Sequence, residues 1–227
     1  MSRFILVAMM LAVTVAGCNR FPDNGLQIAA NLPPDGSCLF GADQDVRLLR
    51  GLYDITYPRD YVIAPLLQSY LVSNALEFQG EQNNLQVDNY EITILLPDDS
   101  VPVLPGGLPN PYTVDTSAVL AANTAGGTIS EEVGVAIGIP ASYKDALRAI
   151  NTETGYSSVI LSIRAGGTTF GGFSQRSAPF RWPVDICEGC LGIVCTEEKA
   201  DELAEDSCLK GQDIWLYCAV IIPSTEP

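Results

Sequence analysis

Apolar and polar residues alternate along much of this chain, and a period of two predicts β-strands. Residues 52–57 show the pattern clearly, because Tyr53, Ile55 and Tyr57 fall on one face of an extended segment while the residues between them are polar. Gly, Pro and Asn separate such segments and mark turns. Further strand patterns occupy residues 61–72, 112–119, 128–139 and 157–165.

The alternation in residues 85–96 changes phase partway along. Leu85 and Val87 are apolar at odd positions, whereas Tyr90 begins a series of apolar residues at even positions. The change falls at Asp88-Asn89. One extra residue inserted into a strand shifts the alternation by one, so the sequence predicts a β-bulge or a tight turn at this dipeptide.

A single helix is predicted over residues 140–150. Pro140 suits the first turn of a helix, because its missing N–H would have no partner there. Tyr143, Ala146 or Leu147, and Ile150 then share one face, which we expect to be buried.

Short strands with one helix between them predict an all-β fold. We expect an immunoglobulin-like antiparallel β-sandwich over residues 37–222, with one short helix and a disulfide-rich C-terminal block. Residues 97–111 contain five prolines and two adjacent glycines and predict a loop. A chain of this length also allows two sequential β domains that divide at that loop. The segment GGTTFGG (166–172) is interpreted as a hairpin turn, because strand signals and no lysine follow it.

The first residues have the organisation of a secretory signal peptide, predicted over residues 1–17. Arg3 supplies a positive charge, and residues 4–17 contain no charge. This run is shorter than the roughly 18–20 residues that span a bilayer. It ends in Val15-Ala16-Gly17-Cys18, which resembles the lipobox of bacterial lipoproteins. The resemblance implies that Cys18 receives a diacylglyceryl group and that signal peptidase II cuts before it.

A lipid on Cys18 would anchor the protein to a membrane without a spanning helix. Each buried methylene contributes about 0.8 kcal/mol, and two or more chains give a stable anchor. Residues 18–36 are rich in Pro, Gly, Asn and Asp, so we expect them to form a loose, lipidated tether. Asn19 follows the cysteine, and by resemblance to the lipoprotein sorting rule this favours the outer membrane, at its periplasmic or surface face.

Composition excludes several classes of function. The net charge of −15 with only 12 Lys and Arg argues against nucleic-acid binding. The chain has no histidine, which excludes Ser-His-Asp and Cys-His catalysis and His-ligated catalytic zinc. No P-loop, dinucleotide-binding or nucleophile-elbow motif occurs. We therefore expect no catalytic residues, no metal and no cofactor.

The remaining cysteines form an even set in an exported chain, which predicts three disulfides. Five of the six lie within residues 187–218 and cannot all pair with one another. Full oxidation therefore requires Cys38 to bond into that block, with its partner left open by spacing. The six are Cys38, Cys187, Cys190, Cys195, Cys208 and Cys218.

The motif CEGC (187–190) has two alternative interpretations. One is a redox dithiol, although the segment is a poor helix opener and has no βαβ context. The other is zinc held by Cys187, Cys190 and two further cysteines, although only one C-x-x-C pair exists. Structural disulfides fit an oxidising compartment better.

The segments PFRWPVDICEGCLGIVC and DSCLKGQDIWLYC resemble the C-terminal block of uncharacterised cysteine-rich lipoproteins of Gram-negative bacteria. This resemblance implies no activity. The sequence thus predicts a lipid-anchored extracytoplasmic envelope protein with a structural or binding role and an unknown protein or glycan partner. The alternative is an envelope enzyme or thiol redox protein that uses carboxylates or the Cys187/Cys190 pair.

Overall fold

The computed structural model describes residues 25–35, 37–43, 45–74, 80–124, 127–195, 208–209, 211–213 and 217–220. The predicted signal peptide, Cys18 and the first part of the predicted tether lie outside these residues. Within the described part of the chain, no helix is both long enough and apolar enough to cross a bilayer.

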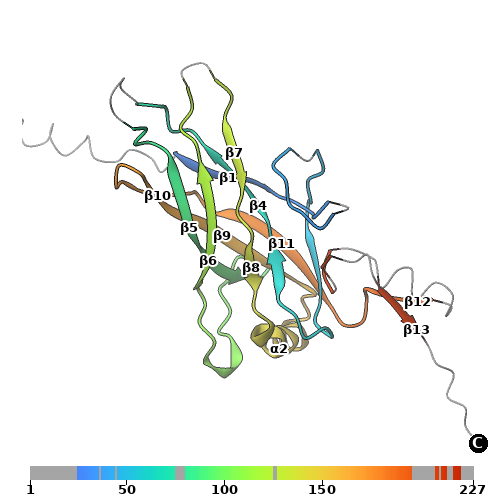
Figure 1. The fold of residues 1–227 in the computed structure, drawn as a ribbon. Helices are drawn as coiled ribbons and strands as arrows, with labels where there is room; N and C mark the ends of the chain where they lie inside the picture. The colour runs from blue at the N-terminus through green and yellow to red at the C-terminus, as the bar shows by residue number, and fades with distance from the viewer. Residues whose placement is uncertain are drawn as a thin grey trace, which may run out of the picture.

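The largest element is a curled sheet of six strands, seen on the left and centre of Figure 1. Its order is β2-β11-β9-β5-β6, and β10 pairs with β9 beyond the end of β11. Most neighbours are antiparallel, but β11 and β2 run parallel. The strands are β2 (Gly51–Asp54), β5 (Leu85–Leu95), β6 (Tyr112–Leu120), β9 (Ser158–Thr169), β10 (Ser174–Arg176) and β11 (Phe180–Cys187).

Smaller sheets complete the fold. One has the order β1-β4-β7, and two-stranded sheets are formed by β3 with β8 and by β12 with β13. Leu26 and Leu67 of the β1-β4-β7 sheet belong to one buried cluster with Val87, Leu161 and Trp182 of the large sheet. The strands are β1 (Leu26–Asn31), β3 (Tyr61–Ile63), β4 (Pro65–Ser69), β7 (Ser130–Val133), β8 (Ala136–Ile139), β12 (Gly192–Cys195) and β13 (Tyr217–Val220).

The predicted helix is confirmed. A 3-10 turn, η2 (Ala141–Tyr143), leads into α2 (Lys144–Thr154), which packs at one end of the sheets (Figure 1). Tyr143, Leu147 and Ile150 are buried as the spacing predicts. The helix ends at Gly155, whose φ of 72° lies in the left-handed region that glycine adopts without strain.

The loop at residues 97–111 joins neighbouring strands of one sheet. It contains a short turn, η1 (Pro105–Gly107), and connects β5 to β6, which pair antiparallel along most of their length. The alternative of two domains divided at this loop is therefore wrong, because the segments before and after it share the same sheet and core.

Three other expectations need correction. The mostly β fold with one helix is confirmed, but the pairing is mixed rather than purely antiparallel, since β2 lies beside β11 in the same direction.

The predicted tether is too long at its C-terminal end. Residues 26–31 form β1 and bury Leu26, and Leu32 is buried as well, so part of this polar stretch belongs to the folded domain. The predicted turn at 166–172 is shorter, because β9 continues to Thr169.

Candidate functional site

A β-bulge and two glycines shape the outer face of the large sheet. The register between β5 and β9 shifts between Val87 and Asn89, which confirms the bulge predicted at Asp88-Asn89. Opposite it stand Gly166 and Gly167. A Cβ on Gly167 would lie 2.3 Å from the carbonyl oxygen of Gln86, and one on Gly166 would lie 2.6 Å from Asn89 Oδ1. At Gly167 the clash is with backbone, so only glycine fits there, whereas the atom that a Gly166 side chain would meet is the end of the Asn89 side chain. Gly166 itself leaves the outer face of β9 without a side chain at this point.

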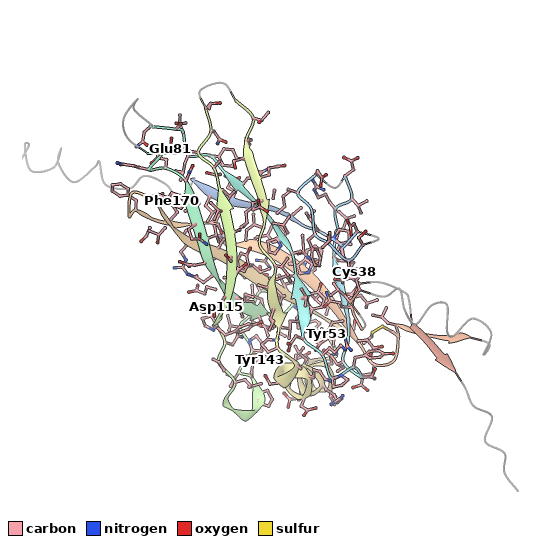
Figure 2. The ribbon with its side chains drawn as sticks, viewed as in Figure 1. Cys38, Tyr53, Glu81, Asp115, Tyr143 and Phe170 are labelled. Atoms are coloured by element: carbon pink, nitrogen blue, oxygen red, sulfur yellow. A yellow bond between two sulfur atoms is a disulfide. The ribbon has the colours of Figure 1, made fainter. Side chains whose placement is uncertain are left out.

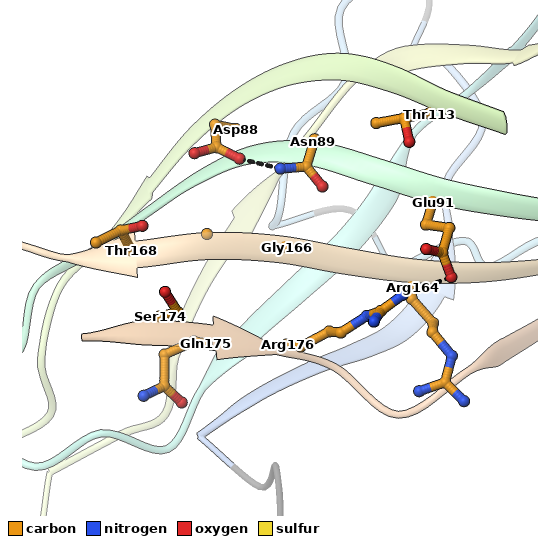
Figure 3. A pocket seen from close by; sticks show the side chains of 11 residues that line it. Asp88, Asn89, Glu91, Thr113, Arg164, Gly166, Thr168, Ser174, Gln175 and Arg176 are labelled. Carbon is orange, nitrogen blue, oxygen red and sulfur yellow. Dashed lines mark hydrogen bonds and ion pairs between the residues drawn. The ribbon is translucent and has the colours of Figure 1, made fainter. Parts of the chain in front are cut away.

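An open hollow of about 450 Å³ lies over this bare stretch. Figure 3 shows polar side chains of β5, β9 and β10 around it, with the Gly166 backbone between them. Because side chains alternate across a strand, Arg164, Gly166 and Thr168 share the outer face of β9. The lining residues are Asp88, Asn89, Glu91, Thr113, Arg164, Gly166, Gly167, Thr168, Ser174, Gln175 and Arg176.

The charges in the hollow are paired in an unexpected way. Glu91 stands directly opposite Arg164 in the β5–β9 register, yet its carboxylate pairs with Arg176 of β10. Arg164 is half-buried and has no ion-pair partner among the described residues. A guanidinium presents five N–H donors in a planar fork. Arg164 therefore offers a hydrogen-bonding group to a ligand in the hollow.

At the other end of the hollow, acceptors dominate. The Asp88 carboxylate accepts a hydrogen bond from the side-chain amide of Asn89 (Figure 3). Two exposed aromatic side chains flank the turn between β9 and β10, Phe170 at 60% and Phe173 at 66% exposure. The hollow thus combines donors, acceptors and a nearby pair of exposed rings.

The structure brings Cys38 together with Cys208 from the C-terminal block. Their sulfur atoms lie 2.01 Å apart with a Cα–Cα distance of 5.2 Å, which is disulfide geometry. Parity predicted a partner for Cys38 in that block, and the fold selects which one. The backbones of Cys195 and Cys218 lie in neighbouring strands β12 and β13, but their side chains are outside the described residues.

The second pair, Cys187 and Cys190, is also at bonding distance and encloses the turn Glu188-Gly189. The buried carboxylate of Asp54 lies beneath this turn, with an oxygen within 4.8 Å of both sulfurs. It accepts backbone N–H groups from Gly189 at 2.8 Å and Leu191 at 3.1 Å.

Hydrogen bonding keeps Asp54 ionised. Burial acts to raise the pKa of Asp54, but hydrogen bonds from Thr56, Gly189 and Leu191 outweigh it and hold the pKa below its usual value. A neighbouring negative charge disfavours a thiolate, which is the form needed for both exchange chemistry and zinc binding. With the sulfurs joined, Cys187 and Cys190 form a disulfide that closes the turn between them.

The Gly211-Gln212-Asp213 segment closes two strand edges. Gln212 exchanges hydrogen bonds with the backbone of Val62, at 2.6 and 2.8 Å. Asp213 accepts the Leu52 N–H at 2.6 Å and donates its own N–H to the Leu52 carbonyl at 2.9 Å. The segment therefore covers the open edges of β2 and β3, which would otherwise leave backbone groups unpaired.

Asp213 is the most perturbed carboxyl in the described part of the chain. Burial raises its pKa to about 6, and the hydrogen bond from Leu52 opposes that rise. Tyr61 donates its hydroxyl to Asp213 at 3.3 Å and accepts the indole N–H of Trp182 at 2.9 Å. Hydrophobic periodicity does not predict the burial of Asp54 or Asp213, because a hydrophobicity pattern assigns aspartate to the exposed face of a strand or loop.

Comparison with known proteins does not assign either region. No protein-family model matches the chain, and no curated protein matches it in sequence. The function has to be inferred from the chemistry of the residues in the hollow and in the cysteine block.

Proposed function

We propose that this protein is a lipid-anchored, extracytoplasmic envelope protein that binds a polar partner and catalyses no reaction. The anchoring part rests on the lipobox-like residues that end at Cys18. By the same resemblance the protein resides at the outer membrane, on its periplasmic or surface face. The six cysteines support an oxidising compartment, because Cys38 and Cys208 stand at disulfide distance.

The observation that carries the binding role is the polar hollow with its unpaired Arg164. A half-buried cation normally finds a carboxylate, and one is directly opposite in Glu91. That carboxylate pairs with Arg176 instead, which leaves the Arg164 guanidinium open to an external acceptor. The hollow lies where Gly166 leaves the outer face of β9 without a side chain.

A hydroxyl-rich glycan suits the hollow best. Arginine donates to pairs of hydroxyl oxygens, and Asp88 accepts from hydroxyl groups. Two carboxylates and two guanidinium groups line the hollow, so its charges balance and favour neither an anionic nor a cationic ligand. The exposed ring of Phe173, beside Ser174 at the rim, offers an apolar face on which a sugar ring can stack.

The carboxylates of the protein support binding over catalysis. An enzyme that uses a carboxylate pair needs both groups in a pocket that substrate can reach. The Asp54 and Asp213 carboxylates accept backbone N–H groups, and each holds a segment of the C-terminal block in place. The two carboxylates of the hollow are also engaged, Asp88 by the Asn89 amide and Glu91 by Arg176. The residues that line the hollow form a shallow polar surface without a nucleophile paired to a base.

We also propose that the fold is a divergent immunoglobulin-like sandwich. The buried cluster that the β1-β4-β7 sheet shares with the large sheet, which includes Leu26, Leu67 and Trp182, supports two packed layers. The parallel pair β2–β11 and the curl of the large sheet are the departures from that plan.

The binding proposal is tested with an array of neutral and acidic glycans and the purified domain from residue 25 onward. We expect retention of a neutral glycan and its loss in Arg164→Gln. The matched control is Arg181→Gln, because Arg181 is exposed and pairs with Asp99 outside the hollow. Equal retention by wild type and Arg164→Gln, or binding lost in both variants, would place the binding site elsewhere.

The alternative role as a thiol redox protein is supported by the exposed position of Cys190 in a C-x-x-C pair. It is opposed by the anionic Asp54 beside both sulfurs. Turnover of a dithiol-dependent disulfide reduction assay, lost in Cys190→Ser, would favour this alternative.

A further inference from the structure

The described fold begins at a fixed point on one end of the sheets. The Gly25 carbonyl accepts the Tyr70 N–H at 3.0 Å. A Cβ on Gly25 would lie 2.7 Å from the Gln175 side chain and 2.8 Å from Leu71. Gly25, the first described residue, therefore lies between the end of β4 and the start of β10.

Exposed apolar side chains gather at this same end. Phe170 and Phe173 flank the β9–β10 turn, which lies beside the start of β1 in Figure 1. The Phe170 N–H donates to the carbonyl of Asn84 at 2.8 Å, and neighbouring Asn83 donates its side-chain amide to the carbonyl of Val72 at 2.7 Å. These hydrogen bonds connect the turn to Val72, which is 56% exposed. Figure 2 shows Phe170 at this end of the molecule, opposite Tyr143.

The length of the intervening chain limits how far this end can lie from an anchoring membrane. Residues 18–24 span at most about 25 Å even when fully extended. With the acyl chains of Cys18 in the bilayer, Gly25 stays within that distance of the surface. By contrast, the loop at 97–111 lies beyond the far end of β5, an 11-residue strand of about 35 Å.

We propose that the end of the domain bearing Phe170 and Phe173 rests on the bilayer that holds the Cys18 acyl chains. This inference depends on the proposed lipid anchor. Phe is among the apolar residues found on the membrane-facing side of interfacial segments, and two exposed rings gain free energy by leaving water. The net charge of −15 excludes attraction to an anionic surface, so the partner is a zwitterionic phospholipid surface.

This orientation has a consequence for the hollow. Ser174 and Gln175, which line it, directly follow Phe173 in the chain. The hollow therefore lies next to the aromatic turn and comes close to the membrane surface when that turn touches the bilayer.

The test uses the full lipidated protein in phosphatidylcholine vesicles whose acyl chains are brominated, because bromine quenches nearby tryptophan. Phe173→Trp reports on the aromatic turn. Val103→Trp is the matched control, since Val103 is 94% exposed on the far loop. Quenching is measured relative to the same variant in unbrominated vesicles, with the wild-type signal subtracted to remove the native tryptophans.

We expect loss of fluorescence for Phe173→Trp and none for Val103→Trp. Failure of the protein to float with the vesicles would refute the lipid anchor itself. Flotation with equal quenching of both variants would refute the orientation alone. A blue-shifted Phe173→Trp emission without bromine quenching would show that a protein, such as a second copy, covers the turn.

Discussion

The carboxyl of Asp213 gives a direct test of how the C-terminal segment is held. Asp213→Asn removes the charge but keeps an oxygen for the Leu52 N–H, which Asp213 accepts at 2.6 Å. The new amide N–H₂ faces the Gln212 amide, whose N–H₂ group donates to Asp213 at 3.2 Å. This contact between two N–H₂ groups lowers the free energy of unfolding by the same amount at every pH. The informative quantity is therefore how the difference between wild type and variant changes with pH.

The direction and the magnitude of this change in stability with pH follow from the pKa of Asp213. Burial raises it from 3.8 to about 6, so the folded protein binds this proton more tightly than the unfolded chain. The stabilisation by this group is fully present below the unfolded-state pKa of 3.8 and is lost as the pH rises through about 6. Each pKa unit corresponds to about 1.4 kcal/mol, so the loss amounts to about 3 kcal/mol.

The assay is urea unfolding of wild type and Asp213→Asn at pH 4 and pH 7.5, followed by tryptophan fluorescence. We expect the free energy of unfolding of the wild type, taken relative to the variant, to fall by about 2 kcal/mol between the two pH values, because part of the full loss already lies below pH 4. Asp45→Asn is the control for removal of an exposed carboxylate. A constant difference for Asp213→Asn would show that this carboxyl is solvated and that the segment is not docked as described.

Three further predictions concern the chain ends and the bulge. Cys18→Ser should abolish incorporation of a fatty-acid probe, and unchanged labelling would refute the lipobox interpretation. Non-reducing peptide mapping should find Cys38 joined to Cys208, and Cys38→Ser should lower the free energy of unfolding by up to about 5 kcal/mol, because the bridge closes a loop of 170 residues; a Cys38 that alkylates without reductant would contradict this. Gly167→Ala should cost about 1–3 kcal/mol by overpacking, measured by thermal unfolding, whereas Gly80→Ala, which has open space around its Cα, should be neutral.

Local pattern determined much of the secondary structure. The phase change at Asp88-Asn89 predicted the bulge, because one inserted residue must reverse the alternation of faces. The spacing of Tyr143, Leu147 and Ile150 predicted the helix and its buried face for the same kind of reason. Both features depend on residues close in sequence, and their geometry is set by the backbone period.

The odd number of cysteines in the C-terminal block predicted a contact between residues far apart in the sequence. Five cysteines in the C-terminal block require an outside partner, which pointed to Cys38 without any knowledge of the fold. The choice of Cys208 came only from the structure, because several cysteines satisfy the same count.

The site and the buried carboxylates were decided by tertiary structure alone. Among the described residues Arg164 has no ion-pair partner, because β10 folds back and supplies Arg176 to Glu91. Asp54 is buried because the turn at Gly189, 135 residues later, donates to it. Polar residues read as exposed until a distant segment supplies their hydrogen-bond partners, and the burial of a polar group is stable only when those partners are present. Sequence periodicity reports which face of a strand is apolar, whereas the hydrogen-bond partners of its polar groups depend on which segments the fold brings together.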